Sequence, residues 1–248
     1  METIKLYAFS APKEPRLCDE FLREHRKVLE DFGISQVTTN NDRWTKDPNT
    51  YVIVALHPQQ GMVGGIRLQI QSDEPLPMEE ALRKLDPRIV NVLHGLKSYG
   101  NGEVCGLWNA NRYANHGIPI LLSKAVTAIS VMANARRMVC LVAHYTQRHP
   151  RRNGFIVIEG VGDTGKFSYP IPSITAIAMV NPDTMILEHA TDEQRQQIFS
   201  LRLRPEQERV EYSGGEPILV QYDLRVNSNV LDLHAYQSIK TERMRYSA

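Results

Sequence analysis

The sequence lacks several features that would assign it directly to a class of proteins, such as disulfide-rich or membrane proteins. It has only three cysteines, Cys18, Cys105 and Cys140, which are far apart and include no Cys-x-x-Cys pair. This excludes a disulfide framework and a thiolate zinc site, and it is typical of a reducing compartment, so we expect a cytoplasmic protein. No apolar run reaches the roughly 18 residues that span a bilayer, and no basic segment followed by an apolar one opens the chain. We therefore predict neither a signal peptide nor integral membrane contact.

An excess of charge of one sign is also lacking. Lys+Arg 29 against Asp+Glu 28 leaves a net charge of +1 over 248 residues, so the chain has no general attraction to nucleic acid or anionic lipid. A local basic patch stays open at Arg148, Arg151 and Arg152, where a solvated turn and a polyanion site both fit the residues. The 42% hydrophobic and 23% charged positions are those of an ordinary globular chain. We predict no nucleic-acid partner.

Signatures of metal, covalent and nucleotide chemistry are missing as well. The eight histidines form no His-Glu-x-x-His motif, and no Gly-x-Ser-x-Gly elbow occurs, so we predict no metal site and find no support for a covalent hydrolase. The segment 160–166 fits both Gly-x-Gly-x-x-Gly and Gly-x-x-x-x-Gly-Lys, but Pro170 and Pro172 follow it. These prolines forbid the helix that a phosphate-binding loop requires, so we predict a hairpin or a long turn.

The hydrophobic pattern predicts strands separated by helices. Strands are expected at residues 3–11, 51–56, 62–70, 103–108, 139–143, 155–159, 173–180 and 217–226, the second and third as a β-hairpin. Helices are expected at residues 15–32, 77–85, 89–99, 120–138 and 191–202, with a basic turn at 148–153 and no strong period at 231–248. The simplest organisation is a single α/β domain with a mixed sheet and a C-terminal extension.

The predicted strand at 62–70 has two unusual features. Gly64 and Gly65 weaken a strand unless a ligand or another backbone approaches closely. Arg67 stands among apolar residues, where a guanidinium needs a carboxylate, phosphate or carbonyl partner. One explanation is a bound ligand. The other is a structural ion pair with one of three acidic residues: Asp42, Asp47 or Glu103.

These segments resemble the core of acyl-homoserine lactone synthases and the related N-acyl amino acid synthases, which belong to the GNAT acyltransferase superfamily. The resemblance is carried by Asp47 and the strand up to Ala55, by Gly64-Gly65-Ile66-Arg67-Leu68 at the family's Gly-x-x-Arg-Leu strand, and by Glu103 at its Glu-x-Ser-Arg-Phe strand. It implies an α/β (α+β) fold: a GNAT-like mixed, mostly antiparallel central sheet with a splayed strand pair, flanked by helices on both faces. The core would cover residues 1–180, with residues 181–248 as an extension packed on the same domain.

Two parts of the family pattern are absent. Cys105-Gly106-Leu107 stands where the family has Ser-Arg-Phe, and Gln69-Ile70-Gln71 stands where it has Pro-Thr after Arg-Leu. These departures weaken the case for lactone formation and for S-adenosylmethionine as the acceptor, and they keep the acyltransferase fold.

The resemblance also implies a chemistry. An acyl thioester of coenzyme A or of an acyl carrier protein would lie between the splayed strands, as a co-substrate and not as a tightly bound cofactor. An amine of a small amino-acid-like acceptor would attack its carbonyl, with Glu103 as general base and Arg67 to orient it or to bind the acceptor carboxylate. The further substrate-binding candidates are Asp42, Asp47, Cys105 and Trp108. The backbone at Gly117 and Ile118, with Arg112 nearby, is the candidate site for the donor's phosphate groups.

Three functions stay open at this point. One is an N-acyltransferase with a medium or long acyl donor, another is a GNAT N-acetyltransferase, and the third is a noncatalytic acyl-thioester-binding or regulatory protein. The lost Ser-Arg-Phe residues favour the third function, whereas Arg67 and Glu103 favour an enzyme. The pattern leaves acyl length, acceptor, donor carrier and oligomeric state undetermined.

Overall fold

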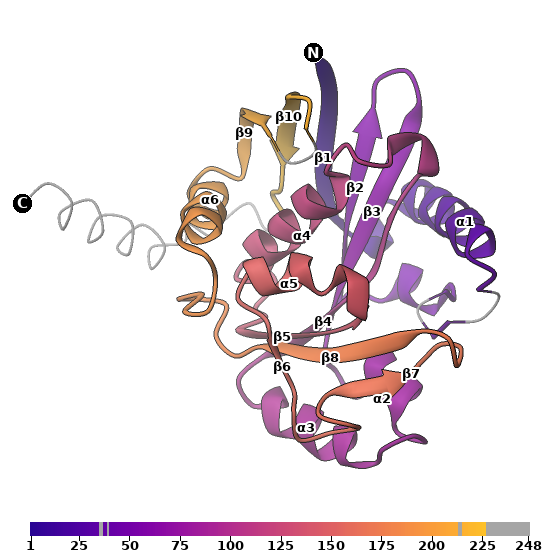
Figure 1. Ribbon diagram of the computed structural model, residues 1–248. Helices are drawn as coiled ribbons and strands as arrows, with labels where there is room; N and C mark the ends of the chain where they lie inside the picture. The colour runs from indigo at the N-terminus through magenta and orange to yellow at the C-terminus, as the bar shows by residue number, and fades with distance from the viewer. Residues whose placement is uncertain (35–36, 39, 213–214, 227–248) are drawn as a thin grey trace, which may run out of the picture.

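The computed structural model describes residues 1–34, 37–38, 40–212 and 215–226. The segment 231–248, predicted without a strong period, lies outside these residues. The described strands form one sheet in the order β6-β8-β5-β4-β3-β2-β1-β10-β9, with β7 beside β8 (Figure 1). The pairs β4–β5 and β1–β10 are parallel and the others are antiparallel. The predicted mixed, mostly antiparallel sheet is confirmed.

Most strands lie where alternation and β-branched residues placed them. Their bounds are β1 Glu2–Ser10, β2 Thr50–His57, β3 Gly61–Ile70, β4 Asn101–Asn109, β5 Arg137–Ala143, β6 Ile156–Val157, β7 Lys166–Ser168, β8 Thr175–Asn181, β9 Glu206–Glu211 and β10 Ile218–Asp223. The β2–β3 hairpin is confirmed. Strand β9 was missed because its residues, EQERVE, are mostly charged.

The helices cover both faces of the sheet, as predicted. They are α1 Pro15–Asp31, α2 Pro77–Leu82, α3 Arg88–Lys97, α4 Ile118–Ile129, α5 Arg148–Arg152 and α6 Asp192–Leu203. In β2, Ile53 and Ala55 belong to the core with α4, whereas Val52 and Val54 belong to the core with α1. A third cluster packs α2 and α3 on β5 and β8. This period-2 alternation places one core on each face.

Two predictions around α4 and α5 were wrong. The helix expected at 120–138 ends at Ile129, because a turn follows in which Asn134 takes a left-handed conformation with φ of 60°. The segment 148–153, expected as a basic turn, forms the short helix α5, in which His149 and Pro150 are buried. The packing of these two side chains, which charge patterning does not reveal, accounts for the helical turn.

The splayed strand pair is present at β4 and β5. Their parallel pairing runs only from Asn101↔Arg137 to Val104↔Cys140. On the other side of β4, Gly65 pairs with Trp108 and Arg67 with Cys105, so β4 carries a bulge at Gly106. Gly106 has a φ of +61°, and a Cβ there would lie 3.1 Å from Arg67 Nε. Glycine at this position therefore lets β4 bend away from β5 above a buried arginine.

The C-terminal part of the described chain is joined to the same sheet. Strand β10 pairs with β1 and β9 pairs with β10. Lys124 of α4 is 1% exposed, and its Nζ donates to both carboxylate oxygens of Glu211 on β9 at 2.8 Å. The division at residue 180 remains a prediction.

Candidate functional site

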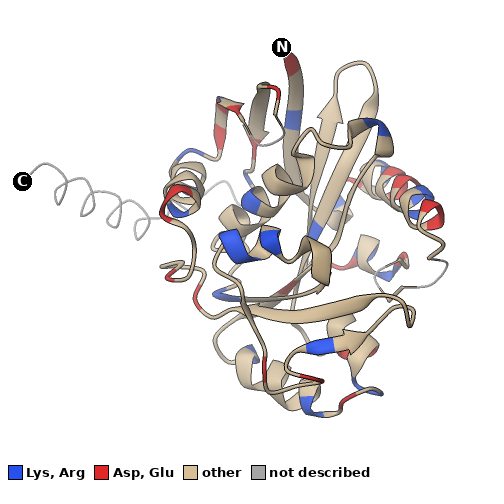
Figure 2. Cartoon of the chain, in the orientation of Figure 1, with Lys and Arg blue, Asp and Glu red and all other residues tan. Residues whose placement is uncertain are grey.

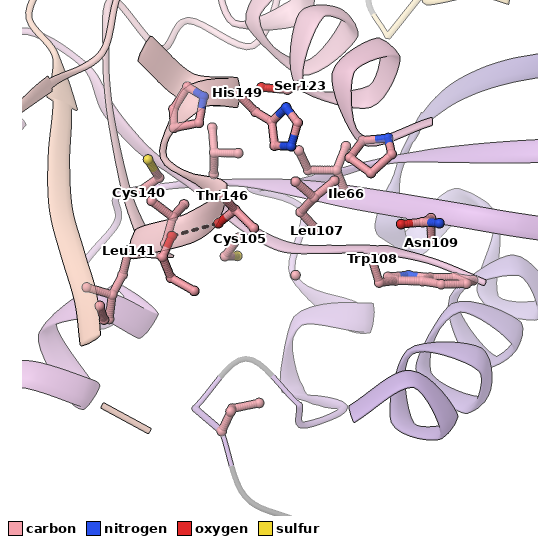
Figure 3. Close-up of a pocket in the computed structure, with 18 of the residues that line it drawn as sticks. Ile66, Cys105, Leu107, Trp108, Asn109, Ser123, Cys140, Leu141, Thr146 and His149 are labelled. Carbon is pink, nitrogen blue, oxygen red and sulfur yellow. Dashed lines mark hydrogen bonds between the residues drawn. The ribbon is translucent and has the colours of Figure 1, made fainter. Parts of the chain in front are cut away.

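A cavity of about 580 Å³ opens where β4 and β5 separate. We call it the cleft cavity. One wall comes from the α4 side of the sheet and includes Ser123, Thr127 and His149, and the other includes His25 of α1 and Glu103. Figure 3 shows residues of β4 and β5 on this cavity, with His149 and Ser123 on one wall. Because the lining comes from both faces, the cavity crosses the sheet at the splay.

Glu103 is the buried carboxyl of this cavity. It is 2% exposed, and its Oε2 accepts a hydrogen bond of 2.7 Å from the Met78 N–H at the start of α2. Burial raises the pKa of Glu103 to about 8, while the Met78 N–H and the Arg67 charge act in the opposite direction. A carboxylate of this basicity, facing a cavity, has the properties of a general base.

Arg67 lies beside Glu103 and is 1% exposed. Its guanidinium carbon lies 4.3 Å from the ring centre of Trp44, which covers it as a cation–π partner. Its positive charge lowers the pKa of Glu103 and also that of His25. The structure thus brings Arg67 close to Glu103, one of the three acidic residues that the sequence offered as its partner.

A second cavity of about 360 Å³ lies on the other side of Arg67. We call it the charged cavity, and its lining includes Arg43, Trp44, Asp47, Arg67, Glu74 and Glu80. Pro77 lines both cavities, and Gly106 of the cleft cavity packs against Arg67. The two cavities therefore approach each other at the Arg67–Glu103 pair. Arg43 donates from Nη2 to both oxygens of Glu80, at 3.0 and 2.8 Å, across the rim.

The two predicted acidic loop residues have different places. Asp47 lines the charged cavity, but its carboxylate also accepts from the Asn49 N–H and the Thr50 hydroxyl, which closes its own loop. Asp42 is exposed and lines neither cavity. The sequence did not point to Trp44, although a tryptophan in a polar loop was an available signal. Its place is set by edge-on packing with Phe21 at 5.5 Å.

The thiols in the cleft cavity are not built for nucleophilic attack. Cys105 and Cys140 both line it and both are buried. Burial raises the pKa of Cys105 to about 12 and that of Cys140 well above its usual value. Both groups are protonated thiols at neutral pH, which argues against a covalent acyl-cysteine intermediate. Trp108, the other predicted cleft residue, lines the cavity and packs edge-on against Phe21.

Two cavity histidines escaped the sequence analysis. Burial and Arg67 lower the pKa of His25 to about 3, and its ring stacks on Trp108 with centroids 6.5 Å apart. Burial, Arg148 and Arg152 lower the pKa of His149. Both imidazoles are neutral at physiological pH. The position of His25, four residues after Phe21 on the inner face of α1, was the available signal.

The predicted phosphate-binding residues are dispersed. Gly117 lines the cleft cavity at the start of α4, whereas the Ile118 side chain is buried. Arg112 donates from Nη2 to the Gln60 and Met62 carbonyls at 3.2 Å and so holds the β2–β3 turn. One basic residue of α5, Arg148, does line the cavity. Figure 2 shows the basic positions of α5 in blue.

The two strand glycines are explained by packing. A Cβ on Gly64 would lie 2.8 Å from the Ile118 side chain, and one on Gly65 would overlap the Phe21 ring. The Trp108 backbone carbonyl also lies 3.0 Å from the position of a Gly64 Cβ, so packed side chains and a neighbouring backbone together account for the two glycines.

Other kinds of site find no support in the described part of the chain. The turn at 160–166 leads into β7 and not into a helix, and its Gly162 N–H donates to Asp86 at 2.7 Å, so the predicted turn is confirmed. Over the described ranges, no three His, Cys, Asp or Glu side chains gather in a way that could hold a metal ion. No helix among those same residues has the length and apolar character to cross a membrane.

Comparison with known proteins gives a structural likeness only. No protein-family model matches the sequence, and no curated protein matches it. The solved structure of FeeM, an N-acyl amino acid synthase from uncultured soil microbes, matches with a TM-score of 0.57 and 14% identity, over 78% of this chain and 99% of that one. The CoA-dependent acyl-homoserine lactone synthase MesI matches with a TM-score of 0.54 and 14% identity, over 79% and 94%. BjaI, a CoA-dependent acyl-homoserine lactone synthase solved with SAM and isopentyl-CoA, gives 0.53 and 14%, over 96% and 100%. The chain shares the fold of these synthases, as its sequence resemblance implied.

Proposed function

We propose that the protein is an N-acyltransferase that moves an acyl group from a thioester to the amine of a small amino-acid-like acceptor. One observation carries this proposal: a cavity crosses the sheet between splayed strands and approaches a second, charged cavity at the buried residues Glu103 and Arg67. The structural neighbours, which are described as an N-acyl amino acid synthase and as CoA-dependent synthases, support the same chemistry.

The reaction follows from this arrangement. The acceptor nitrogen, in the charged cavity, attacks the thioester carbonyl in the cleft cavity, so that a C–N bond forms and the C–S bond breaks. Glu103 takes the first proton, which the acceptor ammonium must lose before it can attack. The nitrogen loses a second proton once the C–N bond has formed, and this proton balances the one that the departing thiolate takes up to leave as a thiol. The raised pKa of Glu103 brings its basicity close to that of an amine, which makes the first transfer feasible.

The acceptor is inferred from the charges around the second cavity. Its lining carries two arginines, Arg43 and Arg67, and three acidic residues, Asp47, Glu74 and Glu80. Both signs at short range suit a zwitterion, with its carboxylate toward an arginine and its ammonium toward the carboxylates.

The donor is inferred from the cleft cavity. Its volume of about 580 Å³ and its mostly apolar lining suit an acyl thioester. Arg148 at the cavity, with Arg151 and Arg152 on the same helix, offers positive charge to phosphate groups on coenzyme A or on the phosphopantetheine of a carrier protein. Because both donors are cytoplasmic compounds and the three cysteines are free thiols, we place the reaction in the cytoplasm.

The test is product formation by the purified protein. We expect an N-acyl product by mass spectrometry, and one equivalent of released thiol, when acyl-CoA thioesters of two to sixteen carbons are mixed with a panel of amino acids. Cys105→Ala and Cys140→Ala should keep transfer, because the mechanism has no acyl-cysteine. Thioester binding without any N-acyl product would support the noncatalytic alternative, and transfer confined to acetyl-CoA would support the acetyltransferase.

A further inference from the structure

The cleft cavity contains polar groups that the proposed transfer does not use. Ser123 of α4 and His149 of α5 line its wall on the α4 side. The lining there also includes the apolar residues Val126 and Phe155, and Figure 3 shows Ile66 beside the same cavity. Polar groups are costly to bury without partners, so a pair of them in such a wall needs an explanation.

The hydroxyl of Ser123 is held in one orientation. Its Oγ accepts a hydrogen bond of 2.9 Å from the Asn153 side-chain amide. Asn153 is itself fixed, since its carbonyl accepts from the Asn181 amide at 2.9 Å and its N–H donates to the Pro150 carbonyl at 2.9 Å. Because Asn153 occupies an acceptor position of the oxygen, the Ser123 hydroxyl proton is available to an acceptor on another side.

His149 adds a second polar group on the same wall. It is 9% exposed, and its Nδ1 is buried with no hydrogen-bond partner among the residues that the structure describes. Arg148 and Arg152 flank it on α5, and with burial they keep the imidazole uncharged. A neutral imidazole has one N–H donor and one acceptor nitrogen to offer.

We propose that Ser123 and His149 form a polar station that hydrogen-bonds an oxygen atom of the bound thioester donor. The inference rests on the proposed function for the identity of the donor and goes beyond it in assigning a recognition site. The group that Ser123 and His149 would recognise is a carbonyl or hydroxyl oxygen. Such an oxygen has two sources in a thioester donor: an amide carbonyl of the pantetheine arm, or an oxo or hydroxyl group on the acyl chain. Buried hydrogen-bonding groups discriminate strongly between ligands with and without the matching oxygen, because in its absence the Ser123 hydroxyl proton and the His149 imidazole gain no partner from the ligand.

The experiment crosses variants with truncated donors. Ser123→Ala and His149→Phe are compared with His144→Phe, which makes the same change at an exposed histidine that does not line the cavity. Dissociation constants are measured with non-transferable thioether analogues, so that binding is read without turnover. Three analogues share one acyl chain: one on coenzyme A, one on N-acetylcysteamine and one on ethanethiol, which has no amide. A fourth carries a 3-hydroxyl on the acyl chain of the coenzyme A analogue.

We expect Ser123→Ala and His149→Phe to weaken binding about three- to tenfold for any analogue with the recognised oxygen and to leave the others unchanged. If an amide is recognised, both coenzyme A analogues lose affinity, the N-acetylcysteamine analogue also loses affinity when the recognised amide is the one nearer the sulfur, and the ethanethiol analogue does not. If the acyl oxygen is recognised, only the 3-hydroxy analogue loses affinity. His144→Phe should change none of these constants.

Two results would refute the proposed role of Ser123 and His149 in donor binding. One is an equal loss for all analogues, including the unsubstituted ethanethiol one, because this would indicate a packing role. The other is the absence of any loss. If the two variants show the predicted selective losses but the wild-type protein acylates no amine, the proposed function is refuted and the assignment of Ser123 and His149 to donor binding is kept.

Discussion

Two clusters of buried charge in this molecule differ in what surrounds them. Lys124 and Glu211 form a closed cluster: the ammonium donates to both carboxylate oxygens and to Gln197 at 2.7 Å, and the Tyr222 hydroxyl donates to Glu211 at 2.7 Å. Glu103 and Arg67 are as deeply buried, but each of them lines a cavity. Burial of charge alone therefore does not mark a functional site. What distinguishes the candidate site is that its buried charges adjoin a cavity with space for a ligand.

The physical reason is how each cluster is compensated. In the Lys124 cluster burial also shifts a pKa, because it lowers that of Lys124. The ammonium, however, is hydrogen-bonded to Gln197 and Glu211, the Tyr222 hydroxyl donates to Glu211, and none of these residues lines the cleft cavity or the charged cavity, so the role of this cluster is to attach α4 to β9. In the Glu103 cluster, burial outweighs the stabilising contacts and raises the pKa to about 8. The first cluster is suited to holding structure and the second to moving a proton.

The largest expected effect is on catalysis. Glu103→Gln should lower kcat for amine acylation by about 10² to 10⁴, the usual contribution of a general base. The fold should survive, because the Gln carbonyl can still accept from the Met78 N–H. Glu30→Gln, at the exposed end of α1, is the control. Measured kcat within twofold of wild type for Glu103→Gln would remove this residue from the mechanism.

The opposite pattern is expected at the closed cluster. Lys124→Met leaves Glu211 buried without its cation, so the free energy of unfolding should fall by about 3 to 5 kcal/mol. Urea unfolding monitored by circular dichroism measures this, and kcat of the folded fraction should stay within twofold. The double variant Lys124→Met with Glu211→Leu should recover much of the loss. If Lys124→Met kept the stability of the wild type and lost turnover, the structural role assigned to the Lys124 cluster would be contradicted.

Histidine burial in the cleft cavity should appear as acid sensitivity. The pKa of His25 is lowered from 6.5 to about 3, so the unfolded chain binds the proton first and stability falls as pH drops below about 6.5. Between pH 7 and pH 5 this group should remove about 2 kcal/mol from the free energy of unfolding, and His25→Phe should abolish that part. His144→Phe is the control. An identical pH dependence in wild type and His25→Phe would contradict the assignment.

The smallest of these effects concerns acceptor binding. Arg67→Met should lower kcat/KM for an amino acid about tenfold and should affect a simple alkylamine less, because the alkylamine has no carboxylate to pair. The pH midpoint of the reaction should also rise, since Arg67 lowers the pKa of Glu103. Arg88→Met, which breaks an ion pair with Asp86 outside both cavities, is the control. Equal losses for the two amines would place Arg67 in a structural role only.

Much of the fold could be predicted from the sequence because it depends on local pattern. The alternation in β1 to β3 and the apolar stripe of α1 specify those elements directly. The pattern predicted too long a helix at α4, because Met132 and Ala133 continue the apolar stripe into the turn that follows it. It missed β9, because a charged edge strand does not alternate in hydrophobicity.

The candidate site was predictable only in part. Arg67 and Glu103 stood out because charge is rare in apolar strands. His149 and Ser123 did not, since a basic segment and an apolar helix each have an ordinary explanation on their own. The charged cavity depends on Arg43 meeting Glu80, which is 37 residues away in sequence. Such long-range meetings are set by packing and leave no local signal.

The most direct test of the account is the pH dependence of amine acylation. Single-turnover rates should be measured from pH 6 to pH 10 with acyl-CoA and two acceptors whose amines differ in pKa. We predict a rate that rises with pH to a midpoint near 8 for both acceptors in the wild-type protein, set by Glu103, and a rate without this midpoint in Glu103→Gln. A midpoint that follows the acceptor's own pKa, unchanged by Glu103→Gln, would contradict the role of Glu103 as the base.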